Sequence, residues 1–301
     1  MSENYSGETA MNRKKTVFVM VIFLLCWASA SLRAAESARL PFFEARKDGV
    51  QIYILGTLHA SKGDPLRPEI TQALARSSQL VMEVSSEEMM TLALSMATQL
   101  CPDACLRRQV SPSSFNKLTT MLPEAGAAMD HLPAWMVSMM LALVDASKAG
   151  LSAESGTEQQ LLALWGSRPT RGLETGEEQI NALASFDDVT QREMLEGYLA
   201  LSEEKRVALN KTLYQLWQSG DVDALFRWYQ KTNEEESLSA STARKIDDKM
   251  IFSRNKRFIE RLRPFLAPDK PVFMAVGALH LGGDQGVLAL LRAQGFTVTA
   301  R

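Results

Sequence analysis

The same four-residue pattern, Gly-x-x-His, follows an apolar strand-like run near each end of this sequence. One copy ends at His59 and follows residues 52–55, and the other ends at His280 and follows residues 272–276. The two copies hold two of the chain's three histidines, although only 17 of the 301 residues are glycine, so coincidence is a poor explanation. Glycine lets the chain turn off a strand end without a Cβ clash. Each histidine is therefore expected just beyond a strand, where open α/β sheets bind ligands.

Two further strand-like runs end on a glutamate, Glu83 after residues 80–82 and Glu174 after residues 170–173. If the four strands are parallel neighbours, both histidines and up to two carboxylates meet at one edge of the sheet. His59, His280 and Glu83 are then candidate ligands for Zn²⁺, Mn²⁺ or Fe²⁺, with positions left for water and substrate. Such a metal would support hydrolysis at neutral pH. Without a metal, either histidine could act as general base, oriented by Glu83.

These polar residues also have purely structural interpretations. A single histidine after a strand is often only a hydrogen-bonded residue, and Glu83 could be an ordinary strand-end acid. Glu174 is the weaker acidic candidate, because Glu177 and Glu178 follow it and indicate the acid-rich first turn of a helix. The repetition of the whole Gly-x-x-His pattern favours a functional interpretation for the two histidines.

Strand-like runs lie near both ends of the chain, and helical patterns fill the middle. Residues 42–47 and 50–55 flank the turn signal Asp48-Gly49 and predict a hairpin. Further elements are expected as short helices at 70–76 and 286–294 and as strands at 79–84, 169–174, 271–276 and 296–299. We therefore predict an α/β fold, with a central mixed sheet built from strands of both ends of the chain. A large helical insertion, at about 87–249, is expected beside it.

The charge balance and the absence of certain motifs argue against several classes of protein. Lys plus Arg number 33 and Asp plus Glu 35, so the formal charge of −2 lacks the basic excess of a general nucleic-acid-binding protein. No Gly-x-Ser-x-Gly sequence supplies the nucleophile of that type of serine hydrolase. Neither a phosphate loop nor a dinucleotide fingerprint is present. The composition therefore predicts no nucleic-acid partner.

The first thirty residues have the order of a secretory signal peptide. A basic triplet at 13–15 precedes an apolar run at 16–27 and the small-x-small sequence at 28–30. The run is shorter than the roughly 20 apolar residues that a membrane-spanning helix needs, although an uncleaved signal anchor is the alternative. We expect residues 1–30 to be removed. Residues 31–301 would then form one exported, periplasmic domain with no membrane segment.

Export changes the interpretation of the cysteines. Cys101 and Cys105 remain after cleavage and flank a turn-forming Pro-Asp-Ala spacer. In an oxidising compartment such a pair is expected to form a local disulfide. Metal binding by the pair is the alternative, but no second Cys or His pair lies nearby in the sequence to complete four ligands.

Together these segments resemble the TraB/GumN family, over about residues 42–298. The matching segments are 56–59, Glu83, 172–179, Arg254-Asn255 and 275–281. The resemblance implies an α/β core with a helical insertion. The same core is expected in the related Tiki proteases, the erythromycin esterases of the EreA type and the haem-binding ChaN proteins.

The resemblance also implies chemistry. Tiki proteases are metal-dependent peptidases that favour manganese or cobalt and use both Gly-x-x-His motifs and an acid, which makes His59, Glu83 and His280 the site candidates here. Arg254 matches the family's Arg-Asn pair and could bind a substrate carboxylate or stabilise an oxyanion. Many bacterial members have Gly-Ile/Val-Asp where this chain has Gly156-Thr157-Glu158, so the role of Glu158 stays open.

The expected function is that of an exported metal-dependent hydrolase, most simply a peptidase, that binds Mn, Co or Zn. His59, Glu83 and His280 would be its metal ligands or its acid and base, and Arg254 would assist catalysis. The alternative is a periplasmic protein that binds haem or a hydrophobic ligand at the same edge without catalysis. The substrate of such an enzyme would be a peptide or a small molecule, but the sequence identifies neither that substrate nor the oligomeric state.

Overall fold

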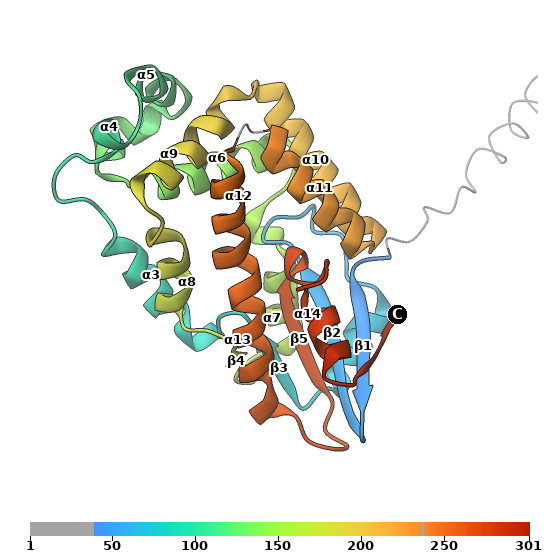
Figure 1. The fold of residues 1–301 in the computed structure, drawn as a ribbon. Helices are drawn as coiled ribbons and strands as arrows, with labels where there is room; N and C mark the ends of the chain where they lie inside the picture. The colour runs from blue at the N-terminus through green and yellow to red at the C-terminus, as the bar shows by residue number, and fades with distance from the viewer. Residues whose placement is uncertain (1–38, 236–237) are drawn as a thin grey trace, which may run out of the picture. The chain divides into compact units, whose positions relative to one another are not determined.

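A computed structural model describes residues 39–235 and 238–301. Six strands form one sheet in the order β4-β3-β5-β2-β1-β6 (Figure 1). Their bounds are β1 Phe42–Lys47, β2 Val50–Thr57, β3 Gln79–Met82, β4 Arg171–Gly172, β5 Val272–Gly277 and β6 Thr297–Ala300. Strands from both ends of the chain lie in this sheet, so the predicted α/β fold with a mixed central sheet is confirmed.

The strand directions place four strand ends together. β4, β3, β5 and β2 run parallel to one another, with β5 between β3 and β2, whereas β1 runs antiparallel to both of its neighbours, β2 and β6. Thr57 pairs with Gly277, and Met82 pairs with Ala275 and Gly172. The carboxyl ends of β2, β5, β3 and β4 therefore lie along one edge, as the four polar strand ends predicted.

The sequence patterns located most of these elements. The hairpin is confirmed, with Lys47 opposite Val50 and a left-handed backbone at Asp48 and Gly49, where φ is +48° and +80°. Short helices flank the sheet as expected, α2 at Pro68–Arg76 and α14 at Val287–Ala293. The central strands β2, β3 and β5 are buried along most of their length, as is typical of parallel strands inside a fold. Their core therefore reads as continuous apolar runs.

Helices make up nearly all of the chain between β3 and β5. After a 3₁₀ turn at Ser86–Glu88, the helices are α3 Met89–Ala97, α4 Leu106–Gln109, α5 Pro112–Met121, α6 Ala134–Lys148, α7 Thr157–Trp165, α8 Gly176–Ala184, α9 Asp188–Ala200, α10 Glu203–Ser219, α11 Val222–Glu235, α12 Ala240–Ile246 and α13 Ser253–Leu262. β4 interrupts this series between α7 and α8. The helices continue past residue 249, because a π-helical turn at Asp247–Phe252 joins α12 to α13.

The described residues form two larger apolar cores and a small third cluster around Trp135, Met136 and Ile180. The sheet core joins alternate residues of β2, β3 and β5 to α13 and α14, which lie beside β5 in Figure 1; examples are Ile54, Met274 and Phe258. A second core joins α4, α5, α6 and α9 around buried leucines such as Leu118 and Leu195. The helical segment thus has its own packing, separate from that of the sheet.

The predicted disulfide joins Cys101 to Cys105, between α3 and α4, with the Cα atoms 6.0 Å apart. None of the helices in the described part of the chain is long and apolar enough to cross a bilayer. The signal-peptide prediction falls on residues 1–30, which lie outside the described residues.

Candidate functional site

The candidate site begins where β3 and β5 end. Glu83 follows β3 directly, and its Oε1 accepts a hydrogen bond from the backbone N–H of Gly277, the last residue of β5, at 2.7 Å. His280 ends the 3₁₀ turn that follows β5, and its Nε2 lies 3.7 Å from Glu83 Oε1. A Cβ at position 277 would lie 3.2 Å from Glu83 Oε1, so a larger residue there would require the Glu83 side chain to move by a few tenths of an ångström. The structure therefore brings Glu83 and His280 together, as the sequence predicted.

Arg254 lies at the centre of this cluster. Its Nε and Nη2 donate to the two oxygens of Glu174 at 3.1 and 2.5 Å, and Nη2 also donates to Glu83 Oε2 at 2.6 Å. Its Nη1 donates to the Met250 carbonyl at 2.9 Å and lies 3.2 Å from His280 Nε2. These contacts engage all five N–H donors that a guanidinium has. As arranged, Arg254 has no further donor for a substrate carboxylate or an oxyanion, the two roles that the resemblance implied.

A local irregularity in the backbone aims Arg254 at the strand ends. The π-helical turn at Asp247–Phe252 lies directly before α13 and supplies the Met250 carbonyl to which Arg254 donates. Such turns add a residue to a helix and redirect the side chains that follow, often at functional sites. No sequence pattern predicted this turn, because π-helical hydrogen bonding has no simple residue signature.

His280 is held as a neutral acceptor. Its Nδ1 lies 2.7 Å from Asn255 Oδ1, while the Asn255 amide nitrogen donates to the Gln285 carbonyl at 2.8 Å. The second bond fixes the amide orientation, so the hydrogen-bond network assigns the ring proton to Nδ1 and the lone pair to Nε2. Burial lowers the pKa of His280 to about 4, and the charge of Arg254 acts in the same direction against the attraction of Glu83. The ring is therefore uncharged at neutral pH.

The two buried carboxylates have opposite pKa shifts. Burial opposes the ionisation of Glu83, but the charges of His280, Arg254 and His59 and the hydrogen bond from the Gly277 N–H together lower its pKa to about 2. Gln179 also donates to Glu83 Oε2, at 3.2 Å. Burial raises the pKa of Glu174 despite the hydrogen bonds from Arg254. The two carboxylates therefore differ in how firmly they hold a negative charge, although they share one guanidinium.

His59 forms the other, exposed part of the site. Its Nδ1 lies 3.0 Å from Glu158 Oε1, which also accepts a hydrogen bond of 2.7 Å from the Thr57 hydroxyl. The hydrogen bond to Glu158 and its charge raise the pKa of His59 above the usual histidine value. Water screens part of this interaction, because 77% of the His59 side chain is exposed. Within the described residues, the carboxylate that orients His59 is thus Glu158, whereas the sequence suggested Glu83.

The start of α7 holds the first Gly-x-x-His motif in place. The Thr157 N–H donates to the Leu58 carbonyl at 2.9 Å, and the Leu58 N–H donates to the Thr157 hydroxyl at 3.2 Å. A Cβ at Gly156 would lie 2.4 Å from the His59 carbonyl oxygen. Residues 156–158 are the segment in which the sequence departs from the family's Gly-Ile/Val-Asp pattern. The longer acid, Glu158, reaches His59 from this position.

The predicted metal ligands do not fit a metal ion as they are arranged. Glu83 and His280 are engaged with Arg254, while His59 is paired with Glu158. Searching the described residues for three or more His, Cys, Asp or Glu side chains placed to hold one ion finds no such group. The types of donor suit Mn²⁺, Co²⁺ or Zn²⁺, but a guanidinium lies among them.

Sequence comparison places all of these residues within one known protein family. Residues 41–300 match the model of the TraB/PrgY/gumN family, which covers the sheet, the helical segment and every site residue. The chain belongs to this family. It is 25% identical over 252 residues to the Escherichia coli (strain K12) protein described as uncharacterized protein YbaP, and equally to that of Shigella flexneri. Each alignment covers 80% of this chain and 87% of the relative. No solved structure matches the chain.

The sequence gives little indication of the role of some residues in the site of this family member. The sequence assigns no firm role to Glu174 or Glu158, yet Glu174 binds Arg254 through both oxygens and Glu158 orients His59. Asn255 and Gln179 lie inside family-like segments, and the sequence alone indicates no role for either. Their signal was their position: Glu174 follows a strand at the same edge as Glu83, and Asn255 adjoins Arg254.

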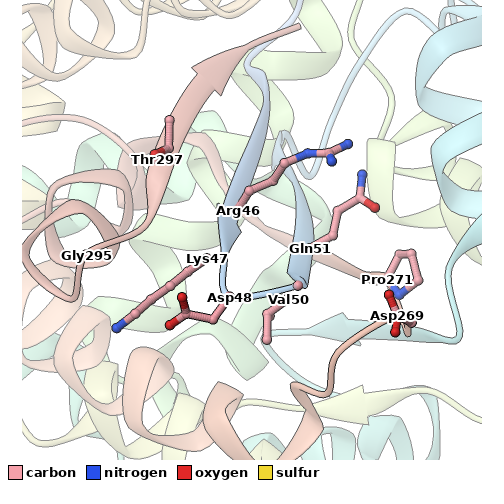
Figure 2. A pocket seen from close by; sticks show the side chains of 10 residues that line it. Arg46, Lys47, Asp48, Val50, Gln51, Asp269, Pro271, Gly295 and Thr297 are labelled. Atoms are coloured by element: carbon pink, nitrogen blue, oxygen red, sulfur yellow. The ribbon is translucent and has the colours of Figure 1, made fainter.

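A separate hollow of about 730 Å³ lies at the other end of the sheet, around the β1–β2 turn (Figure 2). Its basic side chains already have partners. Arg46 Nε lies 2.6 Å from Glu44 Oε1, and Lys47 Nζ donates to the Gln294 carbonyl at 2.7 Å. Its lining contains neither the histidines nor the glutamates of the candidate site. We therefore place the candidate chemistry at the carboxyl ends of the strands.

Proposed function

We propose that this member of the TraB/PrgY/gumN family is an exported hydrolase in which His59 transfers the protons. The observation that carries the proposal is the His59–Glu158 pair at the end of β2. A carboxylate on Nδ1 fixes the orientation of an imidazole and leaves Nε2 directed away from that partner, as a general base requires. The exposure of the ring supports the proposal, because a substrate can reach it.

The reaction follows from these positions. His59 Nε2 takes a proton from water while the water oxygen bonds to the carbonyl carbon of an ester or peptide. The resulting imidazolium, stabilised by Glu158, then returns the proton to the leaving oxygen or nitrogen as its bond to carbon breaks. The buried cluster around Arg254 contributes by holding the ends of β3, β4 and β5 in a fixed arrangement.

A divalent metal, Mn, Co or Zn, is the second form of this proposal. His59, Glu83 and His280 could act as ligands only after Glu83 and His280 leave Arg254. The mechanism above therefore contains no metal-dependent step. Elemental analysis of wild-type protein beside the His59→Ala and His280→Ala variants tests the metal form on its own.

One observation supports the alternative, a binding protein for haem or a hydrophobic ligand. α3 follows Glu83 within a few residues and exposes large apolar side chains; Met89, Met90 and Leu94 are 46%, 70% and 61% exposed. Exposed apolar groups of this kind often mark binding surfaces. A haem titration that gave a saturable Soret band, together with no hydrolysis, would favour this alternative.

The test compares two histidine variants of the exported chain. Activity is measured on aryl esters of different acyl length and, by mass spectrometry, on a peptide mixture, with and without chelator. His59→Gln should lower kcat/KM by roughly 100-fold or more, which is the usual contribution of general acid–base catalysis. His131→Gln is the matched control, because His131 is exposed and lies outside the site. Equal activity of the two variants, or none in wild type, would contradict the proposal.

A further inference from the structure

The sheet ends at β6, and the side of β6 that faces away from β1 is an open edge. Within residues 39–235 and 238–301, β1 is the strand that pairs with β6, and no other strand pairs with its outer side. The four residues of β6, Thr-Val-Thr-Ala, include neither a charge nor a proline. Proteins usually protect an exposed edge with such residues or with a bulge. Apart from its shortness, β6 therefore has no feature that would keep another strand away.

The hydrogen bonding to β1 shows which backbone groups face the open edge. The Arg301 N–H donates to the Phe42 carbonyl at 2.9 Å, in line with the antiparallel register of β1 and β6. In an antiparallel pair every second residue bonds to the neighbouring strand. Thr299, two residues before Arg301, therefore also turns its backbone groups toward β1. Val298 and Ala300 lie between these positions, so they turn their N–H and C=O groups toward the open edge.

We propose that the open edge of β6 pairs with the same edge of a second copy of this chain, antiparallel and about a two-fold axis at Thr299. In this register Val298 lies opposite Ala300 of the second copy, and each such pair exchanges both of its backbone hydrogen bonds. The axis generates the second pair from the first, as in the self-complementary interfaces of two-fold dimers. The inference does not depend on the hydrolase proposal, because it concerns association and not turnover.

The side chains of β6 match one another in this register. Val298 and Ala300 point to one face of the sheet, so each apolar residue meets an apolar residue across the axis. Thr299 points to the other face and is exposed, and it would lie beside Thr299 of the second copy. Cross-strand pairs of threonines stabilise a sheet by about 0.2–1 kcal/mol relative to alanines. The strand is thus its own complement, which favours a second copy over an unrelated strand.

The charges next to β6 are compatible with this pairing. Arg301 would lie opposite Thr297 of the second copy, so the two arginines do not face each other. Within its own chain, Arg301 Nε lies 3.2 Å from Glu44 Oε2. Like charges directly opposite each other would destabilise the pair, and this register places none on the paired strands.

The first test measures association of the exported chain by analytical ultracentrifugation. An interface of one short strand falls below the roughly 1,200 Å² of stable complexes, so we expect a reversible dimer that accumulates with concentration. Ala300→Pro removes an N–H that faces the open edge and no bond to β1, so it should be monomeric at every concentration. Its midpoint of thermal unfolding should equal that of dilute wild type. Ala300→Thr is the matched control, because it keeps the N–H and should still dimerise.

The second test locates the axis by cysteine crosslinking. Residues opposite each other at this kind of position have Cα atoms about 4.5 Å apart, within the range of a disulfide. Mild oxidation should therefore convert Thr299→Cys into a covalent dimer. Thr297→Cys is the matched control, because its two copies would lie about 14 Å apart, beyond the reach of a disulfide.

These two tests decide the proposal together. A wild type that stays monomeric at all concentrations overturns it, and so does dimerisation of a folded Ala300→Pro. Equal crosslinking of Thr299→Cys and Thr297→Cys overturns it as well, because the contact would then lack the proposed register. If Ala300→Pro does not fold, the cysteine variants decide alone, since both substitutions are at exposed positions.

Discussion

Replacing Glu158 by Gln should lower the pKa of His59 by at least about one pH unit. In the wild type, the hydrogen bond and the charge of Glu158 raise that pKa, across a separation of 3.0 Å between Nδ1 and Oε1. Two unit charges at this distance interact by about 1.4 kcal/mol even with the dielectric constant of water, and one pKa unit corresponds to about 1.36 kcal/mol. Because 77% of the His59 side chain is exposed, we use this water-screened value as the minimum.

The assay is an NMR titration of the histidine ring protons. The chain has only three histidines, so the signals can be assigned from single substitutions. Glu154→Gln is the matched control, since Glu154 is an exposed glutamate four residues earlier, on the 3₁₀ turn before α7. An unchanged His59 titration in Glu158→Gln, or an equal shift in the control, would refute the assignment of Glu158 as the partner of His59.

The same variant separates proton transfer from simple support. If His59 is the general base, the deprotonated ring is the active form, and kcat/KM rises as the pH passes the raised pKa of His59. Glu158→Gln should therefore move this rising limb to lower pH and also reduce the plateau, because the imidazolium loses its counter-charge. A purely structural role would lower the whole profile without moving the limb.

Three further outcomes are expected. Gly156→Ala should destabilise the fold by about 1–3 kcal/mol and disturb the His59 signals, because its Cβ would overlap the His59 carbonyl; urea unfolding and NMR measure this. As the pH falls from 6.5 to 4, the free energy of unfolding should fall by up to about 3 kcal/mol, because His280 binds a proton in the unfolded chain but not in the buried site. The His280→Gln variant should lose less stability over this range. If its stability falls in parallel with that of wild type, His280 is not the cause of the pH dependence. Thiol labelling of the denatured, non-reduced protein should detect neither Cys101 nor Cys105, and labelling of both would disprove the disulfide.

Local patterns were sufficient to predict the sheet. The hairpin turn is encoded by Asp48-Gly49, whose left-handed backbone these residue types tolerate. The central strands are apolar runs that end at a glycine or an acid, so their carboxyl ends could be aligned before any pairing was known. The meeting of Glu83 and His280 followed from that alignment, because both residues come directly after neighbouring parallel strands.

The rest of the site depends on where helices pack against the sheet, which the local sequence does not specify. Arg254 reaches Glu83 across 171 residues of sequence, through a π-helical turn that no residue pattern announces. Glu158 reaches His59 only because the start of α7 packs against the loop after β2. Helix periodicity shows which face of a helix is apolar, but it does not show which strand end the helix will meet. The sequence therefore favours Glu83 as the partner of His59, whereas the structure pairs His59 with Glu158.

The buried cluster around Arg254 and the exposed His59–Glu158 pair are suited to different roles in catalysis. Around Arg254, five N–H donors are paired with five acceptors in a buried place. Moving one of these groups would leave its partner without a hydrogen bond, which costs about 1–3 kcal/mol of stability for each buried polar atom. Around His59 the ring is exposed, and a proton can enter or leave without disturbing the core. Proton transfer therefore belongs to the exposed pair, and the buried cluster belongs to positioning. If the buried cluster instead performed the chemistry, the substrate would first have to separate Arg254 from Glu83 and Glu174. Activity would then depend on how strongly these two carboxylates bind the guanidinium.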